Sequence, residues 1–137
     1  MSWFILAWQR ATDFSGRSRR KEYWYFTLFN AIIMIFLALF AIAFSEDRKP
    51  ATFPFFMMFA YGLVVFVPSI AVTIRRLHDI GKSGWWYFIA FVPFVGGIIL
   101  FVFTLLDSRP YPNEWGLDPK ASERAAFPPP PAPIYPQ

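Results

Sequence analysis

Residues 75–86 read Arg75-Arg76-Leu77-His78-Asp79-Ile80-Gly81-Lys82-Ser83-Gly84-Trp85-Trp86. This stretch contains the single histidine of the chain, and it lies between two long apolar runs. A run of about 20 apolar residues is long enough to cross the hydrocarbon core of a bilayer as a helix. The stretch therefore predicts a short polar hinge at a membrane surface, with a membrane span on each side.

The overall composition also favours a membrane protein. The chain has 137 residues, of which 56% are hydrophobic and 16% charged, whereas an ordinary soluble domain has roughly 45–50% and about 25%. A soluble domain of this size keeps too much of its surface exposed to bury so many apolar side chains. The chain has no cysteine, which excludes disulfides, thiolate metal sites and thiol chemistry. We expect one domain embedded in a bilayer.

Three runs without charge predict three transmembrane helices, at about 25–44, 53–74 and 85–106. The third run contains Pro93 and the pair Gly96-Gly97. These residues either let another helix approach closely or mark a bend. The predicted fold is an all-α membrane protein whose domain at 25–106 holds the three spans.

The two ends of the chain have different compositions. Residues 2–11 suit a short amphipathic helix with Trp3 and Trp8 at the membrane interface, and residues 1–24 combine this helix with a basic segment. Residues 107–137 form a tail that is first turn-rich and then proline-rich. The proline-rich end is typical of polyproline II, and a plain disordered tail is favoured over a recognition ligand.

The distribution of Lys and Arg predicts the orientation in the membrane. Eight of these residues lie in the N-terminal segment and the central hinge, which a three-span protein places on one side. The other side would hold five, namely Arg48, Lys49, Arg109, Lys120 and Arg124. Because cytoplasmic segments carry the excess of Lys and Arg, we expect the N-terminus and the 75–84 loop in the cytoplasm and the C-terminal tail on the opposite side.

Several catalytic and metal motifs are excluded by their spacing. Gly81-Lys82-Ser83 lacks the earlier glycine of a phosphate-binding loop, because position 76 is arginine. One histidine without cysteine does not provide the ligands of a zinc site. Ser83, His78 and Asp79 can be written as a triad, but adjacent residues on a helix project about 100° apart, so Asp79 is badly placed to orient His78. We therefore predict no catalytic residue, no cofactor and no metal.

A structural role accounts for more of the hinge. If the second span continues past residue 74, Asp79 forms a helix-surface ion pair with Arg75 or Arg76. Gly81 then ends the helix in a left-handed conformation, and Ser83 caps the next helix.

The basic and aromatic residues of the cytoplasmic face are predicted to bind anionic lipid or a protein partner. These residues are Arg17, Arg20, Lys21, Trp24, Arg75, Arg76, His78, Asp79, Lys82, Trp85 and Trp86. A nucleic-acid partner is not expected, because the basic cluster is interleaved with spans and has no binding fold. A larger membrane complex or a homo-oligomer is the expected context.

The leading functional hypothesis is a non-enzymatic interaction or accessory subunit of the membrane. One alternative is a small oligomeric transporter or channel component whose helix breaks at Pro68, Pro93 and 96–97 line a path. Against it, the spans carry no ionisable residue. The other alternative is an enzyme that modifies lipid headgroups with His78, Asp79 and the arginines.

Three motifs together resemble one known family. They are the 75–86 stretch, the segment Phe14-Ser15-Gly16-Arg17-Ser18-Arg19-Arg20-Lys21-Glu22-Tyr23-Trp24, and the closing element Asn113-Glu114-Trp115-Gly116-Leu117-Asp118-Pro119. In this order they are similar to the domain-of-unknown-function 805 family of small bacterial inner-membrane proteins. The resemblance covers residues 3 to about 120 and leaves the proline-rich end outside. It implies a helical, multi-pass protein of the inner (plasma) membrane, and it supplies no reaction, substrate or cofactor.

Overall fold

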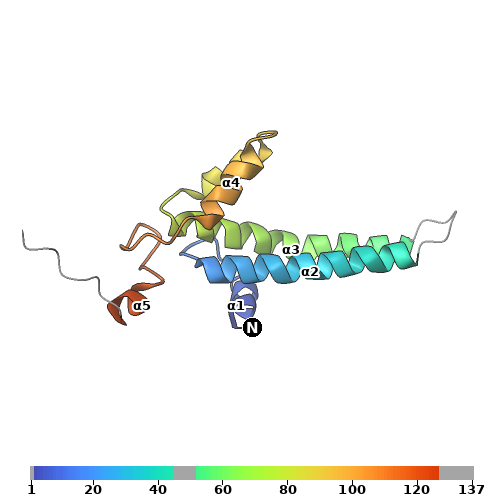
Figure 1. Cartoon of the computed structure of the whole chain (residues 1–137), viewed down its shortest axis with the longest axis horizontal. Helices are drawn as coiled ribbons and strands as arrows, with labels where there is room; N and C mark the ends of the chain where they lie inside the picture. The colour runs from blue at the N-terminus through green and yellow to red at the C-terminus, as the bar shows by residue number, and fades with distance from the viewer. Residues whose placement is uncertain (1, 45–51, 127–137) are drawn as a thin grey trace, which may run out of the picture.

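The computed structural model of the chain describes residues 2–44 and 52–126, which contain helices and no β-strand (Figure 1). The charged loop after the first predicted span and the proline-rich end lie outside these residues. The elements are α1 (Ser2–Gln9), α2 (Arg20–Ala43), α3 (Thr52–Asp79), the 3₁₀ helix η1 (Gly84–Phe91), α4 (Gly96–Leu105) and α5 (Ala121–Ala126).

Two long helices, α2 and α3, pack side by side and form the body of the molecule (Figure 1). Both are long and apolar enough to cross a membrane. At 1.5 Å per residue they reach about 36 Å and about 42 Å, so both exceed the roughly 30 Å of bilayer hydrocarbon. Large apolar side chains such as Phe36 and Phe59 are exposed along them, as expected of a surface solvated by lipid.

The short helix predicted near the N-terminus is present as α1, and it packs against the α2–α3 pair. Its Phe4 and Trp8 rings lie 6.2 and 6.0 Å from the ring of Phe26 on α2. Val65 and Val72 of α3 complete this small core. Part of the aromatic surface of α1 is therefore used for packing within the protein, and its place at the membrane interface stays a prediction.

One polar contact joins α2 and α3 within the spans. Tyr61 Oη donates a hydrogen bond to Asn30 Oδ1 at 2.6 Å, and Asn30 Nδ2 donates to the Phe26 carbonyl at 2.7 Å. Asn30 is buried. Its amide is thus satisfied by a neighbouring helix, which a polar side chain in hydrocarbon requires.

Residues 85–106, predicted as a third span that Pro93 and the pair Gly96-Gly97 interrupt, are not one helix. This segment forms a hairpin, hereafter the arm, in which η1 and α4 pack on each other and diverge from α3 (Figure 1). The chain reverses at Pro93 and Phe94, which has a positive φ of 67°, because proline lacks the N–H that a continuous helix needs. A Cβ at Gly96 would lie 1.8 Å from the Ile89 carbonyl oxygen, so only glycine permits this close turn.

The reversal also corrects the predicted position of the C-terminal tail. Because the arm returns the chain to the end of α3, the tail lies beside the 75–84 loop and not at the other end of the bundle. The Arg109 N–H donates to the Asp79 carbonyl at 3.1 Å. Asn113 Nδ2 donates to the His78 carbonyl at 2.9 Å. The N-terminal segment, the loop and the tail therefore share one end of the molecule.

Candidate functional site

The end of α3 has the geometry that its sequence predicts. The helix continues to Asp79, and Gly81 follows with a left-handed φ of 74°. The N–H groups of Gly81 and Lys82 donate to the carbonyls of His78 and Leu77, both at 2.9 Å. These two bonds form a Schellman motif, which satisfies the last carbonyls of a helix. Ser83 then caps η1, its Oγ accepting the Trp85 N–H at 3.4 Å.

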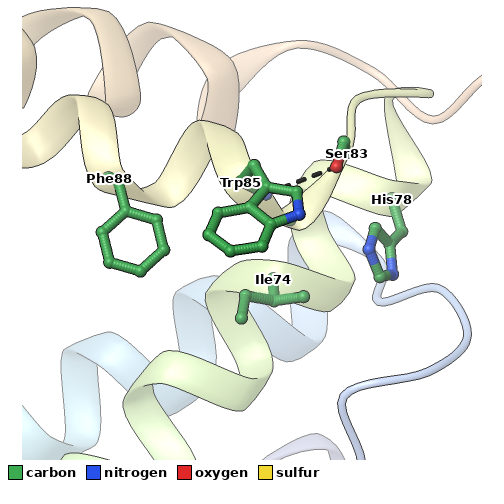
Figure 2. A pocket seen from close by; sticks show the side chains of 6 residues that line it. Ile74, His78, Ser83, Trp85 and Phe88 are labelled. Carbon is green, nitrogen blue, oxygen red and sulfur yellow. Dashed lines mark hydrogen bonds between the residues drawn. The ribbon is translucent and has the colours of Figure 1, made fainter.

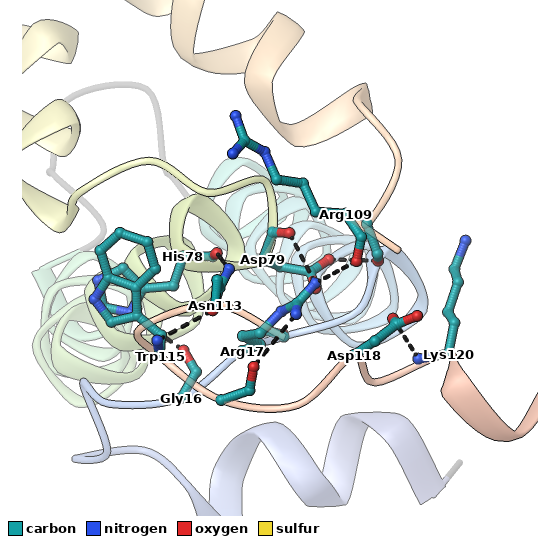
Figure 3. Close-up of polar contacts among 12 residues, drawn as sticks. Gly16, Arg17, His78, Asp79, Arg109, Asn113, Trp115, Asp118 and Lys120 are labelled. Carbon is teal, nitrogen blue, oxygen red and sulfur yellow. Dashed lines mark hydrogen bonds and ion pairs between the residues drawn. The ribbon is translucent and has the colours of Figure 1, made fainter. Parts of the chain in front are cut away.

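Asp79 is the centre of a buried ion cluster, and its side chain is fully inaccessible (Figure 3). Its carboxylate accepts Arg17 Nε at 3.1 Å, a short bond from Arg76, and the Ser108 hydroxyl. The predicted pair of Arg76 and Asp79 is therefore present. It was expected on the helix surface, but tail residues cover it, and both side chains are buried.

Arg17 connects three segments of the chain (Figure 3). Besides the Asp79 carboxylate, its guanidinium donates to the carbonyls of Tyr111 at 2.9 Å and Arg109 at 2.7 Å. The planar, multiply donating guanidinium suits such a junction. The N-terminal segment, the end of α3 and the tail are thus held together by one buried cation.

Arg75 forms a second buried pair, with Glu22 of α2 at 3.0 Å and not with Asp79. Its guanidinium also donates to the carbonyls of Arg10 at 2.6 Å and Asp13 at 2.5 Å. Buried charges require this kind of pairing, because desolvating an unpaired ion costs several kcal/mol or more, on the order of 20 kcal/mol in the idealised limit. The helix α2 begins earlier than predicted, at Arg20, which brings Glu22 into the pair.

His78 is fixed in place without help from Asp79. Its Nδ1 lies 3.2 Å from the Gly16 carbonyl oxygen, and because a carbonyl only accepts, Nδ1 is the donor. The ring is stacked on Trp115, with the ring centroids 4.5 Å apart and the planes at 7°. Ser83, His78 and Asp79 are therefore not hydrogen-bonded to one another as a triad in the part of the chain described.

The predicted binding residues divide into a buried and an accessible set. The buried set is Arg17, Arg75, Arg76, His78 and Asp79, which the cluster holds in place. The partly or fully accessible set is Arg20, Lys21, Trp24, Lys82, Trp85 and Trp86. Within it, Trp24 packs edge-on against Phe101, and the Lys82 ammonium lies 4.6 Å from the Trp86 ring centre. Direct binding by the buried arginines would require the cluster to open.

Four basic side chains gather beside the cluster, around a cavity of about 230 Å³ that we call the basic pocket. It is lined by Arg19, Arg20, Lys21, Lys120 and Glu123. Arg19 forms an ion pair with Glu123 at 2.6 Å. No partner within residues 2–44 and 52–126 is seen for the exposed ammonium of Lys21. The pocket thus has an excess of positive charge that is open to solvent.

Asp107 lies at the edge of the basic pocket. The Lys120 ammonium donates to this carboxylate and holds its pKa below the ordinary value of 3.8, against the opposing effect of partial burial. The pair therefore adds stability at pH values above 3.8, which is lost as the pH falls through the lowered pKa. At neutral pH Asp107 keeps its charge and restrains Lys120.

The sequence reasoning missed Glu22, Ser108, Asn113 and Trp115 as partners of the cluster. One signal could have found Glu22, because a carboxylate next to four basic residues at a membrane surface is a natural ion-pair partner. The tail residues gave a weaker signal. They lie in the closing motif, but the predicted third span placed that motif across the membrane from their partners.

Comparison with known proteins shows the family of the chain. The model of a family described as "Protein of unknown function (DUF805)" matches residues 11–117, which contain the buried side chains Arg17, Glu22, Arg75, Arg76, Asp79 and Ser108. The chain belongs to the DUF805 family. The family resemblance predicted from the motifs is thereby confirmed.

Two relatives of this DUF805 protein come from Escherichia coli (strain K12). Inner membrane protein YhaI is 39% identical over 120 residues, which are 88% of this chain and 97% of the relative. Inner membrane protein YhaH is 38% identical over 120 residues, or 88% and 98% of the two chains. No solved structure matches the chain. With its two long apolar helices, this DUF805 protein is an integral inner-membrane protein.

Proposed function

We propose that this DUF805 protein is a non-enzymatic accessory protein of the inner membrane that binds anionic phospholipid headgroups in the basic pocket. The observation that carries the proposal is the excess of cations around that pocket, where Arg19, Arg20, Lys21 and Lys120 outnumber the carboxylates of Glu123 and Asp107. A phosphodiester offers several acceptors to such donors. Each basic residue near an anionic leaflet contributes about 1 kcal/mol of attraction.

Two of the four cations of the pocket are held by contacts within the protein. Arg20 Nε donates to the Leu105 carbonyl at 3.3 Å, and Arg19 lies over the Trp3 ring at 5.3 Å from its centre. These contacts fix two of the four cations before any ligand arrives, which lowers the entropic cost of binding. Lys120 is held by Asp107, and the exposed Lys21 supplies the fourth charge.

We propose an orientation in which the N-terminal segment and the tail up to residue 126 lie in the cytoplasm. Eleven of the thirteen Lys and Arg residues lie in the N-terminal segment, the central loop and the tail, which share one end of the bundle. The positive-inside rule assigns that end to the cytoplasm. In this topology α2 and α3 span the bilayer, and the arm enters it from the cytoplasmic face and returns.

This topology predicts the labelling of single cysteines, which the natural chain lacks. Phe14→Cys and Leu117→Cys replace exposed residues of the N-terminal segment and the tail. We expect a membrane-impermeant maleimide to label both in inverted vesicles and neither in spheroplasts. Phe36→Cys, within α2, should resist labelling in both. Labelling of Leu117→Cys and Phe14→Cys from opposite sides would refute the shared face, and labelling of both in spheroplasts would refute its cytoplasmic assignment.

If anionic lipid binds in the basic pocket, removing cations from the pocket should lower the retention of that lipid. The purified protein should retain phosphatidylglycerol over phosphatidylcholine in native mass spectrometry from mild detergent. The double variant Lys21→Gln/Lys120→Gln should lower this retention about tenfold, which corresponds to about 1.4 kcal/mol. Lys82→Gln is the matched control, because it removes one charge outside the pocket. Equal loss in the control and the double variant would contradict a site in the pocket.

A further inference from the structure

A second cavity, of about 370 Å³, lies between α3 and the arm. Its lining is Ile74, His78, Ser83, Gly84, Trp85 and Phe88 (Figure 2). This volume is within the range of about 300–1,000 Å³ that small-molecule sites occupy. No lining residue is shared with the basic pocket, and this cleft has no arginine or lysine in its wall. We call it the His78 cleft.

The ring nitrogen of His78 that faces the cleft is Nε2. His78 is only 6% exposed, and its Nδ1 and ring face are already engaged by Gly16 and Trp115. Its Nε2 has no hydrogen-bond partner within the described ranges of the chain. Because Nδ1 carries the proton of the neutral ring, Nε2 presents a lone pair. A ligand that donates a hydrogen bond into the cleft would therefore match this acceptor.

Apart from Ser83, whose Oγ accepts the Trp85 N–H, the other walls of the cleft are apolar and lie on two elements. Ile74 faces the cleft from α3, and Trp85 and Phe88 from η1 (Figure 2). Gly84 keeps the entrance open, since a Cβ there would lie 2.9 Å from Ile74 Cγ2 and 3.5 Å from His78 Nε2. The cleft therefore has a hydrogen-bond acceptor at one end and an aromatic wall beside it, which is the pattern of an amphiphile site.

We infer that the His78 cleft binds a glycerophospholipid whose headgroup carries an N–H donor, as in phosphatidylethanolamine. The ammonium donates to His78 Nε2, and the start of an acyl chain lies along Trp85 and Phe88. A lipid is the fitting occupant because the cleft lies where the polar end of α3 meets the exposed apolar side chains of the arm. A ligand with only acceptors, such as a quinone carbonyl, does not match the lone pair. This inference is independent of the anionic-lipid proposal, because the residues and the headgroup charge both differ.

The test compares two lipids that differ only in the methylation of the headgroup nitrogen, which removes the N–H donors. The full-length protein in mild detergent is mixed with equal amounts of phosphatidylethanolamine and phosphatidylcholine with identical acyl chains, and the bound lipid is identified by native mass spectrometry. The trimethylated headgroup of phosphatidylcholine has no N–H. We expect a preference of about tenfold for phosphatidylethanolamine, because a tenfold difference in affinity corresponds to about the contribution of one hydrogen bond to a charged group. Equal retention of the two lipids would overturn the inference.

Two substitutions of His78 test whether its Nε2 accepts the hydrogen bond from the lipid headgroup. His78→Asn keeps an amide near the position of Nδ1, where it can donate to Gly16, and removes Nε2. His78→Gln places its amide near Nε2 instead. The preference for phosphatidylethanolamine should disappear in His78→Asn and persist in part in His78→Gln, and an unchanged preference in His78→Asn would overturn the inference.

A third variant does not disturb the buried cluster. Trp85 is 78% exposed, so Trp85→Ala should fold normally and lower the retention of both lipids. Wild-type retention in Trp85→Ala would also overturn the inference. Phosphatidylglycerol held by the basic pocket should be lost in Lys21→Gln/Lys120→Gln and kept in Trp85→Ala, which separates the two sites.

Discussion

The substitution Asp79→Asn should destabilise the protein by about 3–5 kcal/mol, the cost of removing one partner from a buried ion pair. The carboxylate is inaccessible and is shared by Arg17 and Arg76. An asparagine has nearly the same size but no charge, so two guanidinium groups would stay buried without a counter-ion. Because Ser108 also donates to Asp79, the tail should detach from the end of α3.

Thermal unfolding in detergent and limited trypsin digestion test this result. The melting temperature of Asp79→Asn should fall, and cleavage in the tail after Lys120 and Arg124 should become faster. Asp107→Asn is the matched control, since it makes the same chemical change at an exposed carboxylate, where an ion pair contributes about 1 kcal/mol or less. If Asp79→Asn were as stable as Asp107→Asn, the cluster would not hold this end of the molecule together.

A substitution of Arg17 tests whether this residue stabilises the protein through its charge, by pairing with Asp79, or through its other contacts. If Arg17 is buried mainly to pair with Asp79, then Arg17→Met should cost less stability in the Asp79→Asn background than in the wild type, because it removes one unpaired cation. The difference between the two costs is the coupling energy of a double-mutant cycle, which lies at about 0.5–3 kcal/mol for residues in one network. Additive costs would indicate that Arg17 acts through its backbone carbonyl contacts alone.

Local patterns were sufficient to predict the helix end at the centre of the sequence. The pairing of Arg76 with Asp79, the left-handed Gly81 and the Ser83 cap each depend on residues within a few positions. The two long apolar helices also followed from their composition, because length and absence of charge decide whether a helix can span a bilayer. Local chemistry thus determined these elements, and no distant contact was needed.

The burial of the arginines could not be predicted in the same way. Arg75 pairs with Glu22, and Arg17 pairs with Asp79, across 53 and 62 positions of the chain. A basic cluster at a membrane surface looks the same in a sequence whether it faces lipid or the protein interior. Further contacts to Arg17 and Arg76 come from the segment that follows the arm, which reaches them because the arm reverses the chain.

The arm itself had the length and the hydrophobicity of a span, so composition alone favoured the wrong structure. What distinguishes it is the combination of Pro93 with Gly96, since the proline ends η1 and the glycine lets α4 begin against the backbone of Ile89. The sequence analysis left open whether these residues mark a bend or a close helix contact. Both occur, because the bend at Pro93 brings Gly96 close to the backbone of Ile89.

The substitution Gly96→Ala should strongly destabilise the arm. A Cβ at this position would lie 1.8 Å from the Ile89 carbonyl oxygen, and backbone must move to admit it. We expect a loss of about 3 kcal/mol, at the upper end of the cost of inserting one methyl group into a packed site. Hydrogen–deuterium exchange of the α4 amides should become about 100-fold faster, because 1.4 kcal/mol is a factor of ten in the opening equilibrium.

The neighbouring glycine provides the control for Gly96→Ala. A Cβ at Gly97 meets no atom within 4 Å, so Gly97→Ala adds the same methyl group without a clash. It should leave exchange in α4 unchanged or slightly slower, since alanine is favoured over glycine in a helix by about 0.5–1 kcal/mol. Equal exchange in the two variants would mean that α4 does not pack on η1 at Ile89. In that case residues 85–106 would be free to form the continuous span that their composition predicts, with the tail on the opposite side of the membrane.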